Sequence, residues 1–500
     1  MCRKQFTRAA IGAFSNNCRS TLLSKGPTPP YTRDTQKAVM NPSSHSFNLS
    51  AEQRFQIQEN DYLRQTVIMS ITVGLLTVAF SLAKTGRDAL FFHDRGLLQL
   101  PMAYMGIGMS SLAAAFLFVR AMKIWGARSA RIGIMIFAAV ALAGFFPLLR
   151  QANHGILMSS FVFIPTIFGL LFASTWLLVS DLFEHAPKTV AAHAFSRIGA
   201  SSLAGGMVGG FISKGLAPHL NPEWLILLAA LGILVVVGVV IKTHGEFCPL
   251  ASTNATKQIT EVKSLSVFSN RYFRILLLLS MAGGLAGLFI EFQFYAAATS
   301  LGNDLRGNAN FFANYYTIIY LGALLVELFL APKIQNKLGL SGGLVILPFV
   351  LLGGSAFAVV AATTLSRSVL KVTEGSLKAS IHRPLWEQAF MPLQSPQRSI
   401  SKILVDGIAP RVAEGFGAIV LLLWAMRFDT GDKQIDLSSM FHDTQWTMWV
   451  ILFSVVIWLF LIHKLRQELG HLDSLQGSET DCVRFPDQCP TTTELGKGIQ

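Results

Sequence analysis

The chain has 500 residues, of which 52% are apolar and 14% charged, against roughly 45–50% and 25% in ordinary soluble proteins. This composition excludes a typical soluble domain and places the chain in a lipid bilayer. The net charge of +13 is carried by lysines and arginines that lie mainly between apolar runs. It therefore indicates membrane topology and not a nucleic-acid partner.

Residues 1–62 are predicted to form a disordered, basic N-terminal tail. Before position 51 the segment carries seven lysines and arginines and a single acid, Asp34, and it lacks the apolar core of a secretory signal. Two alternatives stay open. The first 33 residues have the Arg-rich, acid-poor character of an organelle transit peptide, and a true start at Met40 would leave residues 1–39 outside the mature protein.

Twelve apolar segments follow, each long enough to cross a hydrocarbon core of roughly 30 Å. They lie at 66–91, 100–119, 132–149, 156–183, 198–217, 223–241, 272–296, 311–331, 343–363, 366–390, 403–426 and 446–463. Charges interrupt the segment at 366–390. Since a lipid-facing charge costs roughly 2.5–3.5 kcal/mol on insertion scales, this segment must face protein or water.

The connections alternate between loops rich and poor in lysine and arginine, with sixteen such residues on one side and seven on the other. By the positive-inside rule the richer loops and both termini are cytoplasmic. We therefore expect an integral protein of the plasma (bacterial inner) membrane, with an organelle envelope as the alternative.

The longest internal connection divides the spans six and six, which is typical of transporters built from two halves. We predict an all-α membrane protein with about 12 transmembrane helices in two six-helix bundles. Its parts would be a six-helix bundle at 63–242, a cytoplasmic linker at 243–270, a second six-helix bundle at 271–466 and a polar C-terminal tail at 467–500.

Charged residues inside a span are costly enough to be functional candidates by default. Lys84, Arg87 and Asp88 share one helix face at spacings of three and four, so Lys84 and Asp88 can pair while Arg87 stays available for an anionic solute. The alternative is that these side chains extend to the outer membrane interface together with Arg95.

Glu291 lies deep in the seventh span and is the best single acid in the sequence. Its carboxylate can bind a cationic group, carry a proton or pair with a basic residue across a central cavity; the alternative is a static ion pair between helices. Glu327, nearer the cytoplasmic end of the eighth span, is expected to have a structural or coupling role.

A third charged region lies between positions 374 and 414, where prolines 384, 392 and 410 break or kink helices. Broken helices at membrane depth are tolerated where they line a cavity; part of the region, 394–399, is expected to be a solvated loop. Its charged candidates are Glu374, Lys378, Lys402, Asp406, Arg411 and Glu414.

The glycines and other small residues of 197–210 predict close helix packing. They do not follow a strand, so they indicate no nucleotide-binding loop. The sequence contains no nucleophile–base pair and no metal-ligand spacing, and the five cysteines have no redox spacing. We therefore expect neither an enzyme nor a bound cofactor or metal.

Three segments stand out by their sequence. They are Phe-Ser-Leu-Ala-Lys-Thr-Gly-Arg-Asp-Ala-Leu at 80–90, Leu-Phe-Ile-Glu-Phe at 288–292, and Lys-Ala-Ser-Ile-His-Arg-Pro-Leu-Trp-Glu-Gln-Ala-Phe-Met-Pro-Leu at 378–393 with its continuation at 401–407. They resemble the nucleotide translocases that exchange ATP for ADP in plastids and intracellular bacteria, and their broader bacterial relatives of major-facilitator type, and this resemblance implies a major-facilitator-like fold. The resemblance implies that Arg87 replaces a family lysine and that Glu291 is the family's intramembrane acid.

Two differences accompany this resemblance. The segment 166–176 contains no acid where the translocases have a glutamate, and Glu414 lies near a family lysine. The resemblance therefore extends to the fold more than to the substrate.

We expect a secondary transporter in which Arg87, Glu291, Lys378 and Arg411 face a central cavity and bind a small organic anion, with ATP/ADP exchange implied by the resemblance. One alternative is a proton-coupled major-facilitator transporter of another solute. Another is a non-transporting scaffold or receptor on the same fold.

Overall fold

The computed structural model describes residues 51–94, 96–151, 153–183, 186–243, 269–299, 304–393, 401–427 and 443–484. Within these ranges all regular structure is helical. Most of the predicted N-terminal tail and nearly all of the predicted linker lie outside the described residues, so their predicted character stays a prediction.

The helices before the linker follow the predicted spans closely. They are α2 (Ala51–Asp94), the short 3-10 helix η1 (Leu97–Gln99), α3 (Leu100–Trp125), α4 (Ala127–Leu149), α5 (His154–Leu182), α6 (Lys188–Leu216) and α7 (Pro222–Thr243). Helix α2 begins at Ala51, within the predicted tail, because residues 51–62 are rich in Glu and Gln and lack glycine and proline.

The helices after the linker include two π-helical turns. In chain order they are α10 (Arg271–Thr299), α11 (Leu305–Phe329), α12 (Ala331–Val360), α13 (Thr364–Leu377), η2 (Lys378–His382), α14 (Arg383–Gln388), η3 (Ile403–Ile408), α16 (Ala409–Ala425) and α18 (Trp446–Arg484). The π turns η2 and η3 each precede a proline, as expected for the broken helices predicted in this region. Helix α18 continues into the predicted C-terminal tail.

Ten of the described helical segments are long and apolar enough to cross a membrane. The other two predicted spans, 198–217 and 366–390, lie in α6, which is rich in glycine and serine, and in α13–η2–α14, which is rich in charge. The predicted all-α membrane fold is confirmed.

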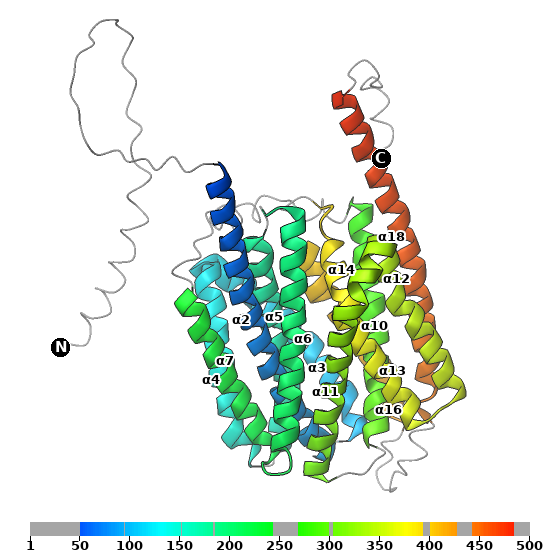
Figure 1. The fold of residues 1–500 in the computed structure, drawn as a ribbon. Helices are drawn as coiled ribbons and strands as arrows, with labels where there is room; N and C mark the ends of the chain where they lie inside the picture. Colours follow the sequence, from blue (N-terminus) through cyan, green and yellow to red (C-terminus); the bar gives the residue numbers. More distant parts are fainter. Residues whose placement is uncertain are drawn as a thin grey trace, which may run out of the picture. The chain divides into compact units, whose positions relative to one another are not determined.

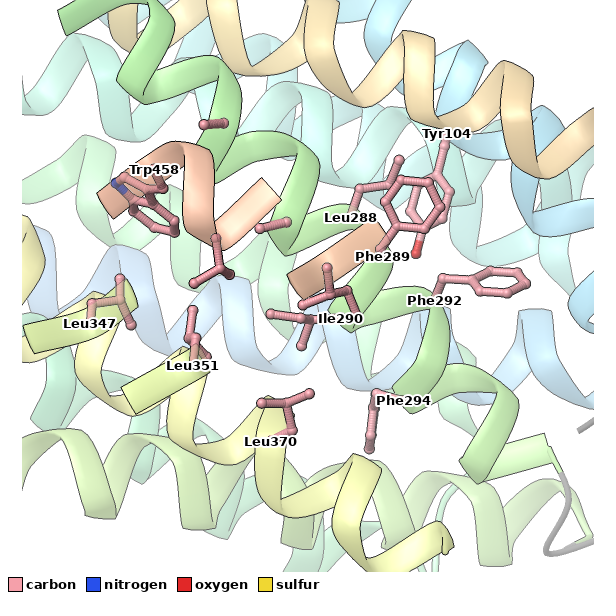
Figure 2. Close-up of a cluster of buried hydrophobic side chains, with 14 of the residues drawn as sticks. Tyr104, Leu288, Phe289, Ile290, Phe292, Phe294, Leu347, Leu351, Leu370 and Trp458 are labelled. Atoms are coloured by element: carbon pink, nitrogen blue, oxygen red, sulfur yellow. The ribbon is translucent and has the colours of Figure 1, made fainter. Parts of the chain in front are cut away.

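The largest hydrophobic core surrounds α10 (Figure 2). The Phe292 ring packs edge-on against the Trp424 ring of α16, with the ring centroids 5.6 Å apart. Leu370 of α13 and Trp458 of α18 belong to the same cluster. Every residue from Leu288 to Ala298 is buried except Glu291. This half of α10 is therefore enclosed by its neighbours, and Glu291 is its one position that is not buried.

Helices α6 and α11 lie side by side and are joined by a seam of glycines (Figure 1). A Cβ added at Gly206 would overlap the Tyr320 ring, and one added at Gly210 would overlap the Thr317 hydroxyl. This is the close packing that the small-residue stripe predicts. A second contact, between α3 and α16, also joins helices on the two sides of the predicted linker.

The variant Gly210→Ala is expected to lose stability, because its methyl group overpacks the seam against Thr317. Overpacking of this kind costs about 1–3 kcal/mol, and thermal unfolding of the purified protein measures it. The matched control is Gly215→Ala in the same helix, where the added methyl meets no other atom. Equal melting temperatures for the two variants would contradict the predicted seam.

Candidate functional site

The predicted acid Glu291 forms an ion pair with Lys84 of α2. The Lys84 ammonium lies 3.2 Å from Glu291 Oε1 and 3.9 Å from Asp88 Oδ2. Both Lys84 and Glu291 remain partly exposed. The pair therefore bridges the first helix before the linker and the first helix after it.

Asp88 is the most enclosed acid of this group. Its side chain is 0% exposed and pairs with the Arg87 guanidinium, whose Nε donates to Oδ1 at 2.7 Å. The hydroxyls of Tyr295 and Tyr316 both donate to Oδ2. Arg87 also lies over the Phe161 ring at 4.1 Å, so in this conformation it is committed to Asp88 rather than available to a solute.

Glu374 of α13 pairs with two lysines. Lys371 lies at 2.9 Å and Lys378 at 3.1 Å from its carboxylate. A Cβ on Gly287 of α10 would sit 3.5 Å from the Lys378 ammonium, which places this group one helical turn from Glu291. Lys378 is the exposed member, with 53% of its side chain accessible.

Arg411 and Glu414 of α16 form an ion pair, in which the arginine Nη1 lies 2.6 Å from the glutamate Oε2. The Arg411 guanidinium reaches across to α5, 3.8 Å from a Cβ placed on Gly169, and it lies within electrostatic range of Glu291. The arginine therefore crosses from a helix after the linker to one before it.

Together these side chains form one group, which we call the charge band. Among the described residues it contains five cations and four carboxylates, so its formal net charge is +1. Its members are Lys84, Arg87, Asp88, Glu291, Lys371, Glu374, Lys378, Arg411 and Glu414.

A cavity of about 200 Å³ is lined by residues that neighbour the charge band along the chain, while no member of the band lines the cavity itself. Phe80 lies one helical turn before Lys84 on the same face of α2, and Ala379 directly follows Lys378. Most of the lining is aromatic or small, with three hydroxyl-bearing residues and one arginine–glutamate pair. It consists of Thr77, Phe80, Phe172, Trp176, Phe195, Gly199, Ser202, Leu203, Tyr320, Ala379, Arg383, Pro384 and Glu387.

The polar end of the cavity is part of a second ion cluster. Glu387 pairs with Arg383, at 2.6 Å, and with Lys402. Asp406 accepts a hydrogen bond from the Trp386 indole at 2.6 Å and lies 3.9 Å from Arg383. Because its two cations face two carboxylates, this cluster is formally neutral.

The structure thus divides the predicted site residues into three places. Lys84, Arg87, Asp88, Glu291, Glu374, Lys378, Arg411 and Glu414 lie in the charge band, Lys402 and Asp406 lie in the second cluster, and Glu327 lies apart from both, beside Ser196 of α6. Sequence reasoning missed the aromatic lining. The spacing of Phe172 and Trp176, four residues apart on one helix face, is the signal that was available for it.

No protein-family model matches the chain, and no curated protein matches it. Solved structures do. A nucleoside transporter, NupG, superposes with a TM-score of 0.53 at 13% identity, covering 80% of this chain and 98% of that one. A POT family transporter in complex with 5-aminolevulinic acid superposes with a TM-score of 0.53 at 15% identity, covering 79% and 96%.

The protein therefore has the fold of major-facilitator-type transporters. These likenesses support the broader of the two resemblances found in the sequence. The narrower one, to ATP/ADP translocases, rests on the sequence motifs alone.

Proposed function

We propose that the protein is a secondary transporter that works by alternating access and carries a small organic monoanion with a planar ring. The observation that carries this proposal is the charge band, with one cation in excess, beside an aromatic-lined cavity. Transport, not catalysis, is the activity that such an arrangement supports.

The charge of the solute follows from the balance of the band. Four of its five cations are matched by carboxylates, and the exposed Lys378 shares Glu374 with Lys371. One anionic group can therefore be neutralised by Lys378 without leaving a buried cation unpaired. A nucleoside triphosphate brings several negative charges, so the band supports ATP/ADP exchange less well.

The shape of the solute follows from the cavity. Its volume of about 200 Å³ is below the roughly 300–1,000 Å³ of sites for drug-sized ligands. The nearly parallel rings of Trp176 and Phe195, 6.1 Å apart, and the ring of Phe80 offer flat apolar surfaces. A single planar ring with one acidic group suits this volume and this lining.

Alternating access requires one closed end. Beyond the charge band, Tyr295 stacks on Phe92 with ring centroids 4.3 Å apart, and its hydroxyl lies 3.0 Å from Asp88. We propose that this region closes the outer end and that the cavity opens toward the cytoplasm. This assignment uses the predicted topology, with both termini cytoplasmic and a six-helix bundle on each side of the linker.

The solute class is tested by thermal stabilisation of the purified protein, followed by counterflow of the labelled stabilising compound in proteoliposomes. We expect benzenesulfonate to raise the Tm, and ATP, adenosine and methanesulfonate to leave it unchanged. The variant Trp176→Leu should lose this stabilisation. Its matched control Trp125→Leu, at an exposed position outside the cavity, should keep it.

Other outcomes separate the alternatives. Stabilisation by ATP together with ATP counterflow against ADP would overturn the monoanion proposal in favour of nucleotide exchange. Stabilisation by adenosine alone would indicate a neutral solute. If none of these compounds stabilises the protein or is transported in counterflow, the proposed solute class is wrong. The scaffold or receptor alternative predicts this result.

A further inference from the structure

Three acids among the described residues are buried to the point that at most 5% of the residue is exposed: Asp88, Glu327 and Glu374. Asp88 pairs with Arg87, and Glu374 pairs with Lys371 and Lys378. Glu327, which is 5% exposed, pairs with no lysine, arginine or histidine of the described residues. It is thus the one buried acid in this part of the chain that no cation neutralises.

The surroundings of Glu327 provide few hydrogen-bond donors for a charged carboxylate. Its Oε1 accepts one long hydrogen bond, 3.3 Å, from the Ser196 hydroxyl, and its Oε2 is buried without a hydrogen-bond partner. The acid lies about two helical turns beyond Tyr320 on α11, outside the glycine contacts of the α6–α11 seam. An isolated carboxylate in such a place is costly, and binding a proton removes the cost.

The charged groups on the neighbouring elements do not change this conclusion. Helix α11 packs against α6, α7, α12, α13 and η2. Lys371 and Lys378 are taken by Glu374, and none of the remaining groups forms an ion pair with Glu327. Those groups, among the side chains that the structure describes, are His193, Arg197 and Lys214 on α6, Glu223 and Lys242 on α7, Lys333 and Lys337 on α12, Arg367 on α13 and His382 on η2.

We propose that Glu327 is a proton-binding site that couples transport to proton movement. The carboxyl group holds a proton on Oε2 while α6 and α11 are packed together, and releases it when the helices separate and water reaches the acid. This inference rests on the proposed function for its transport half, since α6 and α11 belong to the two predicted bundles that move apart. Carrying one proton with one monoanion moves no net charge across the membrane.

Infrared spectroscopy of the purified protein at neutral pH tests the proton itself and needs no solute. We expect a carbonyl stretch of a protonated carboxyl group that disappears in Glu327→Gln and persists in Glu374→Gln, the matched variant of an ion-paired buried acid. Thermal unfolding establishes that both variants are folded. A band unchanged in folded Glu327→Gln, or no band in the native protein, would overturn the proposal.

Proteoliposomes test the coupling. For labelled benzenesulfonate, we expect Glu327→Gln to keep counterflow, which needs no net proton movement, and to lose uptake driven by an acid exterior. Uptake driven equally in the variant and the native protein would exclude Glu327 as the coupling site. If the native protein does not carry benzenesulfonate, the proposed solute class fails, and the infrared result still decides whether Glu327 binds a proton.

Discussion

Replacing Glu291 with glutamine is expected to reduce counterflow by tenfold or more while the protein remains folded. The change removes the nearer of the two carboxylates that hold Lys84, at 3.2 Å, and leaves Asp88 at 3.9 Å. Lys84 then competes with Arg87 for Asp88, and the charge band gains a second unmatched cation. A change of about 1.4 kcal/mol in the balance between the two conformations is enough for a tenfold effect.

A double variant with the two charges exchanged tests whether transport depends on the ion pair between Lys84 and Glu291 or on an acid at position 291. In the double variant Lys84→Glu/Glu291→Lys the pair between α2 and α10 can form again with its charges reversed, and we expect it to recover part of the counterflow that either single variant loses. The matched control is Glu468→Gln, which removes the partner of the exposed Arg271 and should leave transport unchanged.

The scaffold or receptor alternative gives a different result for the same variants. It predicts that Glu291→Gln and Arg87→Gln alter stability but no flux. Counterflow equal to the native rate in correctly inserted Glu291→Gln would show that the pair with Lys84 takes no part in transport.

The sequence was sufficient to predict the helices, because apolar runs long enough to cross a bilayer leave few other structures. It also predicted that Glu291 is unusual, because a charge within such a run is costly. It did not predict the partner. The spacing of Lys84 and Asp88 favoured a pair within α2, whereas the shorter contact of Lys84 is to Glu291, 207 positions away.

The cavity could not be predicted for a related reason. Its lining comes from six helical segments, and each aromatic residue taken alone resembles ordinary core packing. Trp176 and Tyr320 face the same space only because α5 and α11 converge there. Local periodicity identifies the face of one helix, while a cavity depends on how several faces meet.

The largest loss of stability is expected for Asp88→Asn. Asp88 is fully buried and is the counter-ion of Arg87, which is itself only 4% exposed. Removing one partner of a buried pair leaves an uncompensated charge and typically costs about 3–5 kcal/mol. The asparagine amide would also face the hydroxyls of Tyr295 and Tyr316, which donate to the carboxylate in the native protein. Thermal unfolding in detergent measures the loss.

Two further variants show whether the buried charge is the cause. The control Glu468→Gln removes the partner of Arg271, whose side chain is 64% exposed; such a surface pair contributes roughly 0–1 kcal/mol, so its Tm should stay near native. The double variant Arg87→Met/Asp88→Leu removes both buried charges and should recover most of the stability. If it folds but does not transport, the Arg87–Asp88 pair serves the transport cycle; if it folds and transports normally, the pair is only structural and the outer closure rests on Lys84 and Glu291.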